Sequence, residues 1–326
     1  LLGGEGVLRA KPRVVMDWIP LVRRGLPSAC VDAVVRTTRI TQSDLAHALA
    51  IPERAVDVGF ATDFPDADAE TQPEDEALLQ RARAGVERLN ARYPRLDGTP
   101  NFHLLHRPRV WNAVERRWMG HERKRGKLEQ FNAFLRGGAT TAFSTIVGAM
   151  PPPGTVRFVI TLDTDTDLPR GAAAGMIGAL AHPLNRPRFD PGKGRVVEGY
   201  AILQPRVSVR LRAANRSLYT RLACGQAGLD PYSKEVSDVY QDLFGEGSFV
   251  GKGIYDVDAF REALDGRLPE NLVLSHDLLE SAYARSALLG CVEIYEDMPS
   301  SYLGDVSRQH RWMRGDWLAA AMLSRR

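Results

Sequence analysis

The pattern of apolar and polar positions alternates short strand-like runs with longer helix-like runs from about Val56 onward. This alternation is typical of an α/β fold. Residues 55–64 alternate between apolar and polar side chains and break at Pro65, which predicts a strand followed by a loop. The same reasoning predicts strands over 101–107, 157–163 and 291–297, a strand pair over 196–207, and helices over 75–93, 121–138, 256–264, 276–289 and 305–326.

Composition narrows the class of protein. The chain has 326 residues, of which 44% are hydrophobic and 25% charged, so fibrous, collagen-like and wholly disordered proteins are excluded. Lys and Arg number 43 against 40 Asp and Glu, and a net charge of +3 does not suggest a nucleic-acid partner. The three cysteines have no disulfide or zinc-site spacing. No apolar run reaches the ~20 residues of a transmembrane helix, so we expect no transmembrane segment in this chain itself.

Carboxylates follow the predicted strand 157–163, in the order Asp163, Asp165 and Asp167. Open α/β folds bind ligands at the carboxyl ends of their strands. In an extended segment the three side chains would lie on one side, where such close like charges call for a hard cation such as Mg²⁺ or Mn²⁺. The alternative is an acidic turn in solvent.

Further polar residues end or begin other predicted elements. Asp63 closes the strand 55–64, where it could also be a simple turn residue. Lys127 and Asn132 lie on the predicted helix 121–138, and Lys127 could donate to a phosphate or a sugar, or face solvent. The four glycines around Lys252 match no nucleotide-binding loop. They could let the backbone approach a bulky ligand.

Two later segments carry candidate chemistry. His276, Asp277 and Glu280 open a predicted helix, in which Asp277 is either a helix cap or a general base. Arg311 and Trp312 lie on the last helix, where arginine could neutralise a leaving diphosphate and tryptophan could stack on a sugar. The alternative is an ordinary amphipathic helix end.

Long motifs combine these signals in one order: HRPRVWN (106–112), ERKRGKLEQFN (122–132), FVITLDTDTDLPR (158–170), GEGSFVGKGIYDVDAF (245–260), SHDLLE (275–280) and HRWMRGDW (310–317). Together they resemble the glycosyltransferase domain of the cyclic β-1,2-glucan synthases, relatives of the processive membrane synthases that make cellulose and hyaluronan. The likeness runs from about Val58 to Trp317, which is most of the chain.

The resemblance implies a GT-A-type, Rossmann-like domain with a mixed, mostly parallel sheet, spanning 56–326. It implies an inverting transfer of glucose from UDP-glucose to a β-1,2-glucan acceptor, with Mg²⁺ or Mn²⁺ as the cofactor. The implied site residues are Asp277 as catalytic base, Arg311 and Trp312 as the end of the QxxRW motif, Asp163 and Asp165 as metal ligands, Asp63 at the uridine side, and Lys127, Asn132, His276 and Glu280 as further substrate-binding residues.

The resemblance also implies a larger protein. This chain would be a fragment with flanking membrane and glucan-processing domains, on the cytoplasmic face of the bacterial inner membrane. Two departures stand out: Arg308 occupies the position of the QxxRW glutamine, and residues 1–55 lack the family's first strand. We interpret residues 1–55 as an atypical segment, either disordered or translated from a shifted reading frame.

Two other functions remain open at this point. One is a catalytically inactive remnant that binds a nucleotide sugar or a carbohydrate without releasing UDP. The other is a metal-dependent phosphodiesterase built on Asp163 to Asp167, although the several histidines that such two-metal sites recruit are not evident.

Overall fold

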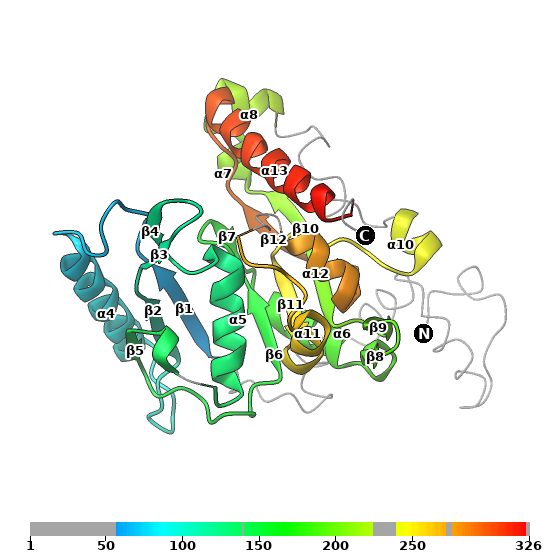
Figure 1. Ribbon diagram of the computed structural model, residues 1–326, viewed down its shortest axis with the longest axis horizontal. Coiled ribbons are helices and arrows are strands. Elements are labelled where there is room, and N and C mark those ends of the chain that lie inside the picture. Colours follow the sequence, from blue (N-terminus) through cyan, green and yellow to red (C-terminus); the bar gives the residue numbers. More distant parts are fainter. Residues whose placement is uncertain (1–56, 139, 224–238, 272–275, 324–326) are drawn as a thin grey trace. The chain divides into compact units, whose positions relative to one another are not determined.

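The computed structural model describes residues 57–138, 140–223, 239–271 and 276–323 (Figure 1). The described residues fold into two compact units. We call them the three-stranded unit (Glu53–Arg157 and Asp265–His276) and the five-stranded unit (Phe158–Leu264 and Asp277–Arg326). Both combine helices with a β-sheet, which confirms the α/β class. The interpretation of residues 1–55 lies outside the described residues.

The three-stranded unit is a sheet of order β1-β2-β5. Strand β1 (Val58–Asp63) runs parallel to β2 (Phe102–Arg107), and helix α4 (Asp75–Arg92) connects the two. Strand β5 (Thr145–Val147) pairs with β2 antiparallel, so β2 is central and is buried along nearly all of its length. The unit also contains a hairpin of β3 (Val110–Asn112) and β4 (Arg117–Met119), helix α5 (Arg123–Leu135) and the 3₁₀ helix η1 (Thr140–Ala142).

The strands and helices expected over 55–138 are confirmed, with ends displaced by up to three residues. The end of α5 shows why the sequence predicts the element boundaries in this stretch. Gly137 adopts a positive φ of 82°, and the backbone N–H of Gly138 donates to the carbonyl of Ala133. A left-handed glycine after the last turn is the common helix stop, so the Gly137-Gly138 pair marks the boundary in the sequence itself.

The five-stranded unit has the strand order β6-β11-β10-β12-β7. Its strands are β6 (Phe158–Thr161), β7 (Thr166–Asp167), β10 (Ile202–Val209), β11 (Gly253–Asp256) and β12 (Ser286–Glu296). Helix α6 (Ala172–Ala181) packs on β10, β11 and β12. The core between them is apolar and includes Met176, Leu180, Leu203, Ile254 and Val292. This core fixes the strands whose ends carry the candidate chemistry.

The expectation of a mostly parallel sheet is wrong for this unit. Strand β10 is parallel to β12, but the pairs β6–β11, β10–β11 and β7–β12 are all antiparallel. Two strands occur in the expected 196–207 stretch, but they do not pair with each other. Strand β9 (Arg195–Glu198) forms a hairpin with β8 (Arg188–Asp190), whereas β10 lies between β11 and β12. Which strand pairs with which depends on distant segments that local patterns do not reveal.

The helix expected over 276–289 is shorter than predicted. Helix α12 spans Asp277–Ala284, and Arg285 then takes a positive φ of 52°. From Ser286 onward the chain is in β12, where Ala287 and Leu288 pair with Leu203 and Gln204 of β10. The apolar run in this segment therefore completes the sheet and does not continue the helix.

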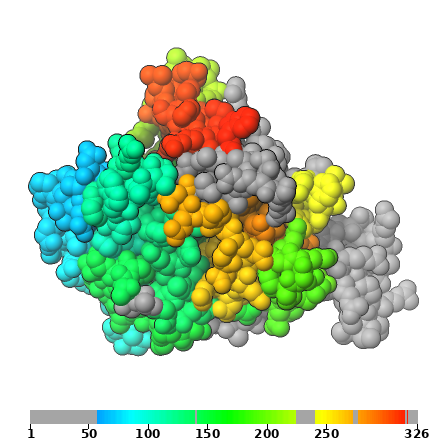
Figure 2. Space-filling model, viewed as in Figure 1, coloured from blue at the N-terminus to red at the C-terminus, as the bar shows by residue number. Residues whose placement is uncertain are grey.

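The remaining elements of the five-stranded unit are η2 (Pro183–Asn185), α7 (Leu211–Ala214), α8 (Leu218–Ala223), α10 (Val239–Phe244), α11 (Val257–Leu264) and α13 (Tyr302–Leu323). Figure 2 shows the outer surface of α13 in red, and Leu303, Met313 and Trp317 are each more than half exposed on this helix. Among the described residues, none of the helices combines the length and the apolar character that crossing a membrane requires.

Candidate active site

The acidic segment after β6 forms a turn. The backbone N–H of Thr166 donates to the carbonyl of Asp163 at 3.1 Å, and Thr166 and Asp167 then pair with β12. The carboxylate of Asp163 faces Lys252, whereas that of Asp167 contacts Arg210. The expectation that the three aspartates lie on one side of an extended segment is therefore wrong.

Lys252 is the cation of this turn, and it immediately precedes β11. Its ammonium lies 3.4 Å from Asp163 Oδ2 and also contacts Glu296 at the end of β12, while its side chain is 14% exposed. Burial alone would lower the pKa of Lys252, but the two carboxylates outweigh that effect and raise it. Lys252 therefore stays charged over the physiological range, beside the carboxylate that the sequence proposes for a diphosphate or metal.

Gly251, the neighbour of Lys252, lies against the carboxylate of Asp277. A Cβ built on Gly251 would lie 2.7 Å from Asp277 Oδ1 and 2.9 Å from its Cγ, closer than real Cβ atoms approach such groups. Gly251 also has a positive φ of 82°. Glycine is thus required here both by the backbone and by the close approach of the carboxylate. Two consecutive residues, Gly251 and Lys252, consequently contact the proposed base and the proposed diphosphate site.

Asp277 is the first residue of α12, and Glu280 follows in the same helical turn. Ligand atoms of the two carboxylates lie within 4.8 Å of each other, and Glu280 is buried. His276, which ends the last segment of the three-stranded unit, is also buried. The carboxylates of Asp277 and Glu280 therefore lie close together, as expected for two residues of the motif SHDLLE that are three positions apart in one helix.

Lys252 has no role that the sequence motifs alone predict. The glycines around it were expected to let the backbone approach a ligand, which stays a prediction, since Gly251 lies against the Asp277 carboxylate of the chain itself. The available signal was the lysine itself, flanked by Gly251 and Gly253 directly before a strand. Its partners Asp163 and Glu296 lie on distant segments, so only the folded sheet reveals the ion pairs.

Asp63 lies at the end of β1, in an ion-paired cluster of the three-stranded unit. Its Oδ1 accepts from Arg107 Nε at 2.6 Å, and its Oδ2 lies 2.8 Å from Lys127 Nζ. Burial opposes the charge of Asp63, but these two cations outweigh it and lower the pKa of the carboxyl. The structure therefore brings two predicted site residues together, Asp63 and Lys127. Asn132, another predicted site residue in this unit, is buried on α5.

We expect the Asp63→Asn substitution to destabilise the chain by about 3 kcal/mol at neutral pH, because it leaves the nearly buried Arg107 guanidinium without its carboxylate. The pKa of Asp63 is lower in the folded than in the unfolded chain. Its stabilising contribution is therefore complete above the unfolded-state pKa of about 4 and is lost as the pH falls through the folded-state value. Thermal melts between pH 7 and pH 3 measure this, and the difference between the two proteins should shrink below pH 4. A constant difference would contradict it.

Arg311 and Trp312 lie in the middle of α13 and are both exposed, with Trp312 at 42%. The guanidinium of Arg308 stacks over the Trp312 ring at 4.9 Å from its centroid. Arg308 also donates to Asp305, which is buried near the start of the helix. The arginine that replaces the expected glutamine is thus held on the surface of its own helix, and the catalytic roles of Arg311 and Trp312 stay predictions.

The donor atoms of the turn after β6 suit a hard cation. Asp163 is half-buried and Asp165 is exposed, and carboxylate oxygens are the ligands that Mg²⁺ and Mn²⁺ prefer. Lys252 already balances part of the charge of Asp163. Both side chains offer the kind of ligand atom that such a cation takes, and their joint role as metal ligands stays a prediction.

Comparison with known proteins supplies the family context. The chain is 47% identical over 288 residues, or 88% of its length, to the cyclic β-(1,2)-glucan synthase NdvB of Rhizobium meliloti (strain 1021). The resemblance to the cyclic β-glucan synthases is confirmed. The matched region is 10% of NdvB, so this chain spans about a tenth of the length of that relative. No family model matches the chain.

Proposed function

We propose that this chain is an inverting glycosyltransferase domain that transfers glucose from UDP-glucose to a growing β-1,2-glucan. The observation that carries the proposal is the Gly251-Lys252 pair, which contacts both Asp277 and Asp163. Asp277, a carboxylate that can accept a proton, therefore lies against Gly251, the residue before Lys252. Lys252 in turn pairs with Asp163 at the acidic turn. The similarity to NdvB, whose name describes a cyclic β-(1,2)-glucan synthase, supports the substrate class.

The proposed reaction is a single displacement. Asp277 takes the proton of the attacking acceptor hydroxyl, whose oxygen forms a bond to the anomeric carbon of glucose. The bond from that carbon to the diphosphate breaks on the opposite face, and its electron pair leaves with UDP. The α-linkage of UDP-glucose therefore becomes a β-linkage. A Mg²⁺ or Mn²⁺ ion held by Asp163 and Asp165 would supply positive charge to the leaving diphosphate.

Lys252 has a defined part in this scheme. Its ammonium is fixed by Glu296 and Asp163, and it is nearly buried, so its charge is little screened by solvent. It keeps the Asp163 carboxylate in place at the start of the turn. Preorganised charge of this kind stabilises a developing anion without a further cost of reorganisation during the reaction.

The other roles that the resemblance implies belong to the proposal as well. Asp63 would hold the uridine side, and Arg311 with Trp312 would meet the leaving group and a sugar. Lys127, Asn132, His276 and Glu280 would complete substrate binding. The longer protein would add membrane and glucan-processing domains and would place this domain on the cytoplasmic face of the bacterial inner membrane.

The test is turnover of UDP-glucose by the chain in the presence of Mg²⁺ or Mn²⁺ and a linear β-1,2-gluco-oligosaccharide. We expect release of UDP together with lengthening of the oligosaccharide by β-linked glucose, read by chromatography and NMR. Binding of UDP-glucose without release of UDP would indicate an inactive remnant and would refute the proposal.

The metal is tested by the Asp165→Ala substitution. Like charges of a diphosphate and two carboxylates repel unless a cation lies between them, so UDP should bind only weakly after chelation of divalent ions. We expect the variant to lose the metal-dependent part of UDP affinity, about 10-fold or more, as measured by calorimetry with and without Mg²⁺. Asp190→Asn, on the β8–β9 hairpin, is the control and should keep it. Equal UDP affinity in all these conditions would rule out the metal site.

A further inference from the structure

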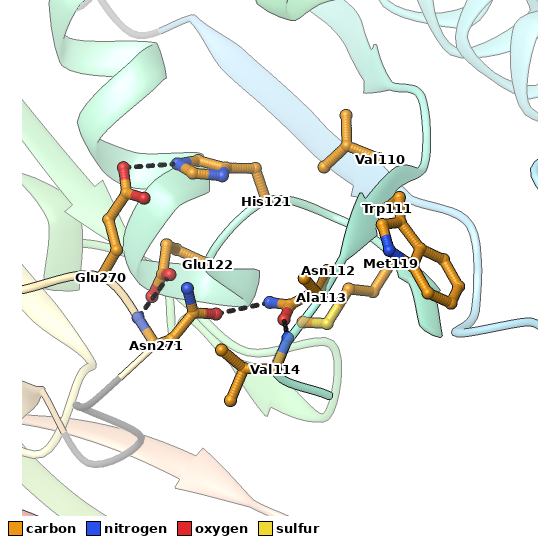
Figure 3. Close-up of a pocket in the computed structure, with 10 residues that line it drawn as sticks. All are labelled: Val110, Trp111, Asn112, Ala113, Val114, Met119, His121, Glu122, Glu270 and Asn271. Atoms are coloured by element: carbon orange, nitrogen blue, oxygen red, sulfur yellow. Dashed lines mark hydrogen bonds and ion pairs between the residues drawn. The ribbon is translucent and has the colours of Figure 1, made fainter. Parts of the chain in front are cut away.

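Acidic side chains that gather on this chain differ in whether a neighbouring residue already holds them. One such pair lines a small pocket beside the β3–β4 hairpin (Figure 3). There, Glu122 Oε1 accepts from the backbone N–H of Asn271 at 2.8 Å, and Glu122 Oε2 lies 2.6 Å from Arg125. Glu270 Oε1 lies 3.8 Å from His121 Nε2. Both acids of this pocket therefore have a partner within the chain.

The turn after β6 contains a carboxylate of a different kind. Asp163 pairs with Lys252, and Asp167 pairs with Arg210. The carboxylate of Asp165, between them, is exposed and makes no hydrogen bond or ion pair with the residues that the structure describes. Two acids of the turn are thus neutralised by cations of the chain, and Asp165 is the one left open to a ligand from solution.

The guanidinium of Arg210 contributes to this division at three points. Its Nε contacts the carboxylate of Asp167, and its Nη1 donates to Asp297 Oδ1 at 3.3 Å. Its Nη2 donates to the main-chain carbonyl of Asp165 at 3.1 Å. The Arg210 backbone N–H also donates to the carbonyl of Glu296 at 3.0 Å, directly after β10. Arg210 therefore holds the side chain of Asp167 and the backbone of Asp165 at the same time.

The shape of a guanidinium allows one side chain to make all these contacts. Its donors lie in a rigid planar fork, whereas a lysine ammonium is a point charge. Asp297 follows directly on β12, so the fork joins the turn to the end of that strand. Thr166 Oγ1 adds a hydrogen bond to Glu296 at 3.3 Å. The turn is thus held to the sheet at its middle and at its end, and a fixed backbone at Asp165 limits the positions open to its carboxylate.

The number of carboxylates around a hard cation decides how many positions remain for a substrate. Mg²⁺ needs near-octahedral oxygen ligands and usually binds one or two carboxylates together with phosphate oxygens. A third carboxylate would occupy a position that a phosphate oxygen needs, and its charge would repel the diphosphate. We propose that Arg210 is a positioning residue that keeps Asp167 from binding the cation and leaves Asp165 to bind it. The cation and the diphosphate rest on the proposed function.

The test is titration of the 326-residue chain with Mn²⁺ in the presence of UDP, in which electron paramagnetic resonance measures the free ion. We expect Asp165→Asn to weaken Mn²⁺ binding about 10-fold or more, the effect of losing one carboxylate beside a divalent ion. Asp167→Asn should change it less than about 3-fold, because Arg210 already neutralises that carboxylate. Arg210→Gln releases Asp167, so Asp167→Asn added to Arg210→Gln should weaken binding about 10-fold.

The control is Arg206→Gln. Arg206 lies on β10 and pairs with Glu293, so this substitution removes an equal charge near the turn without releasing Asp167. Asp167→Asn should have the same small effect in the Arg206→Gln chain as in the unchanged chain. An arginine with a purely structural role would lower the melting temperature, but it would not make the effect of Asp167→Asn depend on residue 210.

Thermal melts establish that each variant is folded, and if Arg210→Gln is not, the comparison of Asp165→Asn with Asp167→Asn decides. Equal losses of Mn²⁺ affinity in those two variants overturn the inference. An effect of Asp167→Asn that is the same with and without Arg210→Gln also overturns it, as does a chain that binds no Mn²⁺. Release of UDP from UDP-glucose judges the proposed function separately. A chain that shows the expected Mn²⁺ pattern and releases no UDP keeps the role of Arg210 and loses the transferase.

Discussion

Replacing Asp277 by asparagine should lower the rate of glucose transfer by ~10²–10⁴, the usual contribution of a general base. The amide has nearly the same size as the carboxylate and can still lie beside Gly251, but it cannot take the proton of the attacking hydroxyl. Affinity for UDP-glucose should change little, so the loss should be in kcat and not in KM. Single-turnover release of UDP and calorimetric binding of UDP-glucose measure the two quantities separately.

The control for this substitution is Asp258→Asn. Asp258 is also an acidic residue in the first turn of an eight-residue helix, α11, and it is exposed. If an acid at the beginning of a helix acts through the helix dipole or capping alone, both substitutions should cost a similar ~0.3–1 kcal/mol of stability and leave turnover intact. Near-normal transfer by the Asp277 variant would assign that residue to capping and remove the proposed base.

Local patterns predicted the elements whose boundaries are written in the sequence. Strand β2 was expected over 101–107 and spans Phe102–Arg107, and α4 was expected over 75–93 and spans Asp75–Arg92. In each segment the apolar residues follow the spacing of one type of element, strand or helix, and polar residues come directly after the element ends. Strand β6, expected over 157–163, spans Phe158–Thr161 for the same reason. Its acidic continuation, however, turns at Asp163 and does not stay extended.

The errors occur where the outcome depends on distant partners. An apolar run such as Ala287-Leu288-Leu289 fits a helix or a strand equally well, and pairing with β10 decides the matter. Whether neighbouring strands are parallel or antiparallel also depends on distant partners, since β11 lies between β6 and β10 and is antiparallel to both. Nothing local to these segments encodes that order.

The candidate site follows the same rule. The motifs predict roles for Asp63, Asp163 and Asp277 from their positions at the ends of strands and the start of a helix. They could not identify Lys252, because the ion pairs with Asp163 and Glu296 join segments about 90 and 44 residues away along the chain. They also could not predict that both oxygens of Asp63 face cations, Arg107 and Lys127, which depends on the packing of α5 beside β1.

Replacing Gly251 by alanine should reduce transfer about 100-fold with little change in UDP-glucose affinity. The new methyl group would lie 2.7 Å from Asp277 Oδ1, so the carboxylate must move away from its present position. A misplacement of about 1 Å at a reacting group can cost ~10²-fold in rate. The alanine also meets backbone strain, because φ at this position is +82°. The rate of transfer and the melting temperature must therefore be measured together.

Gly154 and Gly266 separate these two effects. Their φ values are +80° and +66°, close to that of Gly251, but a Cβ built on either meets no atom within 4 Å. Alanine at these positions should bring the same backbone cost, roughly 1–2 kcal/mol, with transfer by the folded protein unchanged. Gly251→Ala should match them in melting temperature and differ in kcat. If all three variants lose stability alike and keep their specific activity, the reaction does not depend on the position of the Asp277 carboxylate. Moving that carboxylate would then leave the chemistry intact.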